Sequence, residues 1–196
     1  MRLVGRWWAV PLAALVVGGC GVQPPVPAGQ TYEVVAPLFS LKGGPTQACN
    51  GILLSLPPAG CGGIFVSGVD IRRIPGLTRY WDGTMETPPQ RLHGVWSRSK
   101  LTLNLTEPAR PASYPVAQDS PCALTSPAIE PQLLALEQEV VQGQAAIKQH
   151  GIVLLQFGPC GDVLSILVAV ADTDAFAYLQ GTYGNVVISG WLTPVG

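Results

Sequence analysis

The chain has 196 residues, of which 47% are apolar and only 12% charged, and its formal net charge is −1. This length allows one domain or two small ones, and the near-neutral charge argues against the strongly basic surface of a nucleic-acid-binding protein. The 23 glycines and 19 prolines predict short strands joined by many tight turns.

The first 20 residues have the pattern of an export signal. Arg2 and Arg6 precede an apolar run over residues 7–17. This run is too short for a bilayer, which takes about 20 residues, so we interpret residues 1–19 as a signal peptide. The signal ends in Val-Gly-Gly-Cys, which resembles the lipobox of bacterial lipoproteins and predicts lipidation of Cys20. The alternative is an ordinary secretory signal followed by a coincidental cysteine.

Residues 20–31 contain the lipidated cysteine and a proline-rich tether. At about 3.1 Å per residue this tether holds the rest of the chain roughly 30 Å from the membrane. We therefore expect the protein on the extracytoplasmic face of the cell membrane, with the membrane as a partner through the lipid anchor.

Residues 32–110 form a β-rich half. Short apolar runs at 52–56 and 64–71 predict strands, and residues 90–97 with 100–106 predict a hairpin. The second hairpin strand has a period of two. Its apolar face consists of Leu101, Leu103 and Leu105. The expected fold here is a small antiparallel β barrel or a curled sheet.

Residues 111–196 form an α/β half, and the fold class of the whole chain is α+β. The order is helix, strand, strand, helix, strand. The expected elements are 131–149, 152–157, 163–171, 173–183 and 186–192. If residues 114–117 add a strand in front, the order becomes β-α-β-β-α-β, which is ferredoxin-like.

The two halves differ in charge. Residues 42–110 carry eight basic and four acidic residues, whereas residues 111–196 carry seven acidic residues and the single base Lys148. Together with the proline-rich segment 108–127, this asymmetry predicts a joint near residues 110–120.

Four cysteines remain after Cys20, an even number in a chain bound for an oxidising compartment. Three connectivities are open, and we favour Cys49 with Cys61 and Cys122 with Cys160 because each pair stays within one half. No Cys-x-x-Cys spacing occurs, so neither a metal site nor a redox motif is expected.

Several sequence strings resemble a group of uncharacterised exported lipoproteins from high-GC Gram-positive bacteria. These strings are Cys49, LPPAGCGG at 56–63, VSGVD at 66–70, LHGVW at 92–96, LTL at 101–103 and the ending over 183–195. The resemblance implies export and supports the cysteine pairing. It implies no activity and no catalytic residue. Where that group often has an Asp-Gly turn, this chain has Ser-Arg-Ser-Lys at 97–100.

Two short strings match catalytic or anion-binding motifs. Residues 97–100 fit Ser-x-x-Lys of penicillin-interacting enzymes, but the partner motifs are absent and the string falls in a predicted turn rather than at a helix start. Residues 60–63, Gly-Cys-Gly-Gly, fit an anion cradle, but a tight turn around a disulfide explains them better. We expect neither string to be a site.

Acid–base candidates are few. Asp70, Asp82, Glu86 and His93 are the residues that a hydrolase or transferase would use. Alternation along the strand 90–97 places His93 opposite Leu92, and no Gly-x-Ser-x-Gly elbow occurs. We therefore expect His93 on the solvent face. The other histidine, His150, is expected at a helix C-terminus.

A ligand-binding surface is predicted where arginines accompany aromatic residues, because charge and stacking together bind polyanions or oligosaccharides. The residues are Arg72, Arg73, Arg79, Tyr80, Trp81 and Arg91. The alternatives are docking against the acidic half, or simple solvation.

The favoured function is a non-enzymatic binding, accessory or scaffold module at the cell envelope, without a cofactor. Its expected partners are an envelope protein or a polyanionic or glycan ligand. One alternative is a hydrolase or transferase acting on cell-wall glycan or lipid, and another is a carrier of a small apolar ligand.

Overall fold

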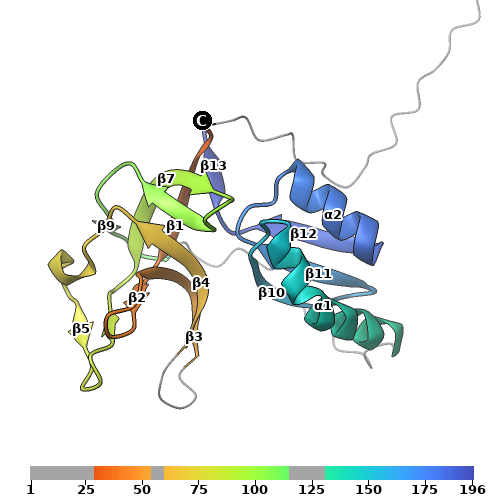
Figure 1. Ribbon diagram of the computed structural model, residues 1–196, viewed down its shortest axis with the longest axis horizontal. Helices are drawn as coiled ribbons and strands as arrows, with labels where there is room; N and C mark the ends of the chain where they lie inside the picture. The colour runs from red at the N-terminus through yellow and green to blue at the C-terminus, as the bar shows by residue number, and fades with distance from the viewer. Residues whose placement is uncertain (1–28, 54–59, 115–130) are drawn as a thin grey trace, which may run out of the picture.

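The structure is a computed structural model that describes residues 29–53, 60–114 and 131–196. Two units lie side by side (Figure 1), one built on a ten-stranded sheet and the other on a three-stranded sheet with two helices. The predicted α+β class is confirmed. The signal peptide, Cys20, most of the tether and Cys122 lie outside the described residues.

Strand β1, Thr31–Ala36, lies near one edge of the large sheet. Its alternation buries Tyr32 and Val34, which are 4% and 6% exposed. β1 pairs antiparallel with β7, Gln90–Ser97, on one side and with β13, Thr193–Val195, on the other. The two ends of the described chain therefore lie in adjacent strands.

The predicted hairpin is confirmed as β7 paired with β8, Thr102–Leu105. A Cβ on Gly94 would lie 2.3 Å from the carbonyl oxygen of Asn104, so only glycine fits this close approach. β8 also pairs in parallel with β4, Gly60–Ser67. The expectation of a purely antiparallel sheet is therefore wrong at this one pair.

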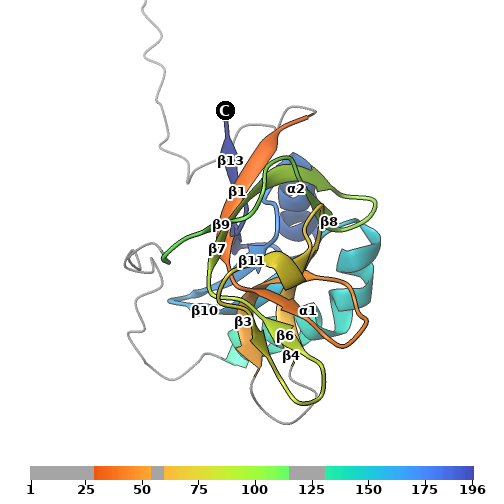
Figure 2. The ribbon, with the colours of Figure 1, turned by 90° about the vertical axis from the view of Figure 1, so that its left-hand side faces the viewer.

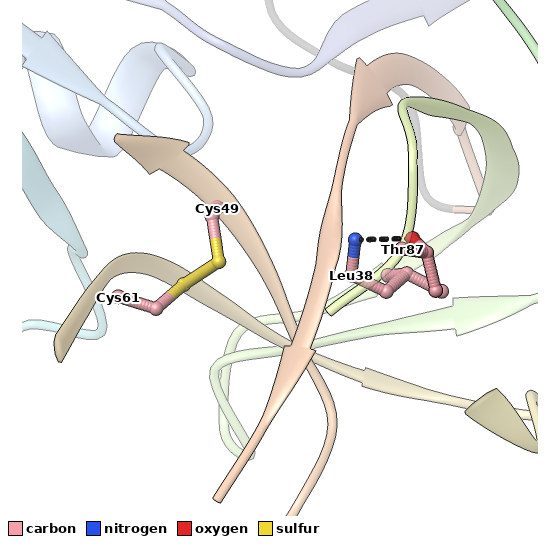
Figure 3. Close-up of a disulfide and its surroundings, with 4 residues drawn as sticks. All are labelled: Leu38, Cys49, Cys61 and Thr87. Atoms are coloured by element: carbon pink, nitrogen blue, oxygen red, sulfur yellow. Dashed lines mark hydrogen bonds between the residues drawn. A yellow bond between two sulfur atoms is a disulfide. The ribbon is translucent and has the colours of Figure 1, made fainter. Parts of the chain in front are cut away.

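The predicted Cys49–Cys61 disulfide is confirmed, with the two Cα atoms 5.4 Å apart (Figure 3). It joins β4 to β3, Gln47–Leu53, and the two strands pair antiparallel with an irregularity between Cys49 and Gly51. Residues 60–63 therefore open a strand instead of forming the expected turn. β4 also ends at Ser67, short of the expected 71.

The strand after Ser67 gives way to a short 3-10 helix, η1, Ile71–Arg73. Asp70 begins it, because its side chain accepts a hydrogen bond from the Arg72 amide at 3.1 Å. Ile71 is buried, at 5% exposed. The apolar run 64–71 predicted one strand. Its last residue, Ile71, instead reaches the core from this helical turn.

The remaining strands of the large sheet are short: β2, Leu38–Ser40; β5, Thr78–Arg79; β6, Met85–Glu86; and β9, Arg110–Pro111. The order is β13-β1-β7-β8-β4-β3-β2-β6-β5, and β9 pairs with β7. β13 and β5 end this path without pairing to each other, so the sheet is open and the expected barrel is not formed.

Helix α1 spans Pro131–Gln149, as predicted from its apolar spacing. After it, Gly151 has φ +72°, its amide bonds the Lys148 carbonyl, and the Ile152 amide bonds the Ile147 carbonyl. These are the two hydrogen bonds of a Schellman cap. The predicted glycine stop is therefore confirmed.

The other elements of this unit are β10, Leu154–Cys160; β11, Val163–Val168; α2, Thr173–Tyr183; and β12, Val186–Gly190. The Asp172 carboxylate caps α2 by accepting from the Ala175 amide at 2.9 Å. The strand order is β10-β11-β12, with β11 and β12 parallel. The ferredoxin-like order is unconfirmed, since residues 115–117 lie outside the described part.

The predicted last strand, residues 186–192, ends earlier than expected, and a separate strand follows it. β12 ends at Gly190, and the chain then crosses to the large sheet as β13. Leu192, at 2% exposed, lies in the core of the β-rich unit together with Ala169 and Val170. The two units thus share core residues. Figure 2 shows the molecule from the side of the β-rich unit, with the α/β unit behind it.

Candidate functional site

A groove of about 500 Å³ lies on the β-rich unit, beside the disulfide. The short β5–β6 hairpin forms one side, and the middle of β3, residues 49–51, forms another. Tyrosine, proline, threonine and one carboxylate dominate its lining. The residues used below are Thr78, Tyr80, Glu86, Thr87, Pro88 and Tyr114.

The β5–β6 hairpin sets Tyr80 and Glu86 against each other. Its turn is fixed by Asp82, whose carboxylate accepts from the Thr84 amide at 2.9 Å. The Tyr80 amide then donates to the Thr84 carbonyl at 2.9 Å. Across the turn the Tyr80 hydroxyl donates to Glu86 Oε2 at 2.7 Å, a charge-assisted hydrogen bond. The other carboxylate oxygen of Glu86, Oε1, takes no part in this hydrogen bond.

The groove wall is rigid at its proline corner. Thr87 is 3% exposed. Its Oγ1 accepts from the Leu38 amide at 2.9 Å (Figure 3) and donates to the Pro88 carbonyl at 2.8 Å. Gly76 adopts φ +78°, and a Cβ there would lie 2.9 Å from Pro88 Cγ. The hydrogen bonds of Thr87 and the close approach of Gly76 to Pro88 therefore fix this wall without a ligand.

Glu86 is the only charged residue among the described residues that line the groove. Its hydrogen bond raises the pKa of Tyr80 above the ordinary value. Burial raises the pKa of Tyr114, and the Glu86 charge adds to this shift. Both tyrosines are therefore neutral phenols at neutral pH, and the groove offers aromatic faces with one anionic acceptor.

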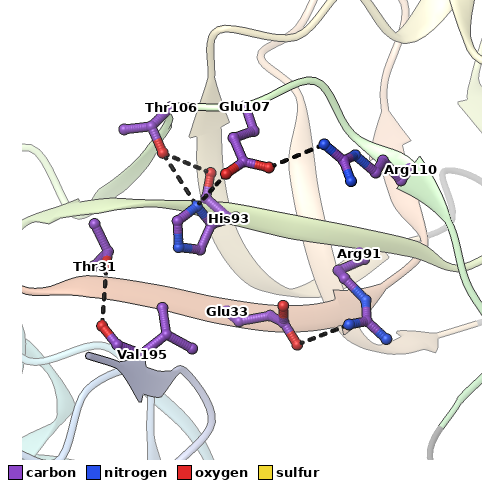
Figure 4. Close-up of polar contacts among 8 residues, drawn as sticks. All are labelled: Thr31, Glu33, Arg91, His93, Thr106, Glu107, Arg110 and Val195. Atoms are coloured by element: carbon purple, nitrogen blue, oxygen red, sulfur yellow. Dashed lines mark hydrogen bonds and ion pairs between the residues drawn. The ribbon is translucent and has the colours of Figure 1, made fainter.

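The predicted arginine and aromatic surface is brought together only in part. Tyr80 lines the groove, whereas Trp81 is 91% exposed and is not among the lining residues. Arg91 is 3.6 Å from Glu33 across β1 and β7 (Figure 4), and Arg73 is 3.3 Å from Asp70. Arg72 and Arg79 are exposed and do not line the groove.

His93 lies away from the groove. Its Nδ1 is 3.3 Å from Thr106 Oγ1 and 3.5 Å from Glu107 Oε1, and Glu107 in turn is 3.3 Å from Arg110 (Figure 4). The side chain is 27% exposed, so it is half-buried rather than fully solvated. The expected alternation holds, because neighbouring Leu92 is completely buried.

The four acid–base candidates have separate surroundings. Asp70 caps η1, Asp82 holds the β5–β6 turn, Glu86 receives the Tyr80 hydroxyl, and His93 contacts Glu107. None of the hydrogen bonds or ion pairs found in the described ranges joins two of these four. The described residues also include no group of His, Cys, Asp and Glu that can hold a metal ion.

The Ser-x-x-Lys string lies in the β7–β8 turn, as predicted. Its Arg98 crosses to the other unit, where it forms ion pairs with Asp172 and, at 3.1 Å, with Asp174. Docking against the acidic half therefore occurs through Arg98, which was not among the predicted arginines. The other histidine, His150, stacks on Tyr178 with ring centroids 3.9 Å apart.

Tyr114 and the Pro88 corner were missed as site residues. Tyr114 was noted only as part of a possible extra strand, yet it is 58% exposed and lines the groove. In the sequence, a Pro-Pro pair at 88–89 lies between these two tyrosines, Tyr80 and Tyr114. This pair is the one sequence signal for the groove, and it was not used.

Cys160 is disulfide-bonded. Because Cys122 lies outside the described residues, the pairing of Cys122 with Cys160 stays a prediction. Neither of the described helices is long and apolar enough to cross a membrane. No family model, curated protein or solved structure matches this chain.

Proposed function

We propose that this protein is a membrane-anchored lipoprotein that binds a neutral glycan of the cell envelope without changing it chemically. The export signal and Cys20 supply the anchor at the extracytoplasmic face. The resemblance to exported lipoproteins supports this address. The groove on the β-rich unit is the proposed binding site.

The observation that carries the ligand class is a groove whose described lining includes two tyrosines and one carboxylate but no basic residue. A sugar ring has an apolar C–H face, which packs on aromatic rings, and hydroxyl donors, for which Glu86 is a charged acceptor. A polyanion would meet the Glu86 charge without a compensating cation. The groove therefore favours the glycan over the polyanion among the expected ligands.

The hydrolase or transferase hypothesis is the alternative. Most glycosidases place a pair of carboxylates on either side of the scissile bond. Among the described lining residues Glu86 is the single carboxylate, and it is already engaged by Tyr80. This arrangement supports binding over hydrolysis.

Binding to purified, protein-free cell walls tests the proposal. The wild-type chain should sediment with the walls, and Tyr114→Ala should weaken binding by roughly tenfold, as expected for one aromatic anchor worth about 1–1.5 kcal/mol. Trp81→Ala is the matched control, because Trp81 is also an exposed aromatic, 91% against 58%, but does not line the groove. Equal binding by wild type and Tyr114→Ala would contradict the proposal.

Anchoring is tested separately. We expect Cys20→Ala to abolish incorporation of radiolabelled palmitate and to release most of the protein from the membrane, because two acyl chains provide the stable attachment. Equal labelling of the variant and the wild type would refute lipidation at Cys20 and would leave the groove proposal unaffected.

A further inference from the structure

A second cavity lies where the two units meet, away from the groove. Its volume is about 530 Å³. One wall comes from β3 and β4 and the other from α1 and β10, which face each other in Figure 1. The apolar side chains that line it are Ile64, Phe65, Leu101, Ile152, Leu154 and Phe157.

The walls of this cavity belong to both hydrophobic cores, and part of their surface is open to solvent. Ile64 and Ile152 are 1% and 4% exposed, so the floor is part of the folded core. Phe65 is 39% exposed even though it is a large aromatic residue. A concave apolar surface that ends in partly exposed aromatic side chains is typical of a binding site for an apolar molecule.

One charge stands at the edge of this cavity. Lys148, in the last turn of α1, is the only charged residue in the described part of the chain that lines it. It is also the only basic residue of the acidic half. None of the ion pairs formed within the described ranges includes Lys148. The cavity therefore combines mainly apolar walls, to which Gln47 and Gln144 add amide groups, with one cation, Lys148.

We propose that this cavity binds a long-chain carboxylate, such as a fatty acid. The hydrocarbon chain lies along the apolar walls, and the carboxylate lies at the Lys148 ammonium. The volume is within the range of about 300–1,000 Å³ for small-molecule sites. This site shares no lining residue with the glycan groove, so either proposal can fail without the other.

The head group is tested by comparing dodecanoate with dodecanol, which has the same chain and no charge. Calorimetric titration uses the full mature chain carrying Cys20→Ala, so that its own acyl chains do not compete. Lys148→Gln should weaken dodecanoate binding about fivefold, the effect of one partly exposed ion pair, and should change dodecanol binding less than about twofold. An equal change for both ligands would overturn the assignment of Lys148.

The apolar walls are tested by filling them. Ala145 is an exposed α1 residue that lines the cavity, so Ala145→Leu should weaken both ligands about tenfold. The matched control is Ala146→Leu, at an exposed neighbouring position that does not line the cavity. The proposal is overturned if the wild type binds no dodecanoate, or if both leucine variants behave alike.

Discussion

The two units hold their folds in different ways. In the α/β unit, β10 and β11 are joined by a tight turn, and α2 connects the parallel strands β11 and β12. In the β-rich unit, β1 pairs with both β7 and the distant β13, and the side chain of Gln30 donates to the Val195 carbonyl at 2.7 Å. One unit is made by local contacts and the other by contacts between remote segments.

This difference bears on where a site can form. The groove lies between the seven-residue strand β3 and the two-residue strands β5 and β6, and strands of two residues are too short to be stable by themselves. β6 pairs with β2, which in turn pairs with β3, so the positions of the short strands depend on the rest of the sheet. The shape of the groove should therefore depend on the integrity of the whole β-rich unit, and the following predictions test that dependence.

The largest effect is expected from truncating buried leucines. Leu92 in β7 and Leu179 in α2 are both completely buried, so Leu92→Ala and Leu179→Ala should each lower the free energy of unfolding by about 3 kcal/mol. Because the units share a core, we expect one cooperative transition in urea for each variant. Two separated transitions, one per unit, would show that the units fold independently.

A similar or slightly smaller effect is expected from the disulfide of the β-rich unit. Cys49 and Cys61 are 12 residues apart, and the chain-entropy model gives about 3 kcal/mol for a loop of that size. The double variant Cys49→Ala with Cys61→Ala should lose this stability and weaken wall binding, since Cys49 lines the groove. Unchanged urea stability would contradict the entropic account.

The smallest effect is expected at the joint between the units. Arg98 pairs with Asp172 and Asp174 and is 31% exposed. Arg98→Ala should cost about 1 kcal/mol, and the difference from wild type should shrink in 1 M salt. Lys100→Ala, in the same turn but without an ion pair among those found, is the control. A loss of stability that is independent of salt would indicate that the Arg98 side chain acts by packing against Gly151 instead.

The sequence predicted the element order and both helices of the α/β unit because their signals are local, but β10 spans 154–160 instead of 152–157 and β11 ends at 168 instead of 171. Pro131 begins α1, Asp172 caps α2, and Gly151 and Gly184 end the two helices. The β7–β8 hairpin was predicted for the same reason. The end of β12 and the departure of β13 were missed, because the pairing of β13 with β1 depends on a remote partner that no short pattern reveals.

The candidate site was predicted only in fragments. Tyr80 and Glu86 were singled out, but for different roles, and the pairing of β5 with β6 joins them. Of the predicted arginines, Arg73 and Arg91 form ion pairs outside the groove, and none of the four lines it. Tyr114 lines the groove from a segment with no periodic signal, so its part in the site follows from tertiary structure alone.

The central claim is that the groove binds a neutral glycan, and an NMR titration tests it most directly. The 15N-labelled mature chain carrying Cys20→Ala is titrated with soluble neutral oligosaccharides released from purified walls. We predict amide shift changes concentrated at the groove residues Thr78, Tyr80, Glu86 and Thr87, and a titration that needs roughly tenfold more oligosaccharide in Tyr114→Ala. Shift changes confined to residues outside the groove, or none at millimolar oligosaccharide, would contradict the account.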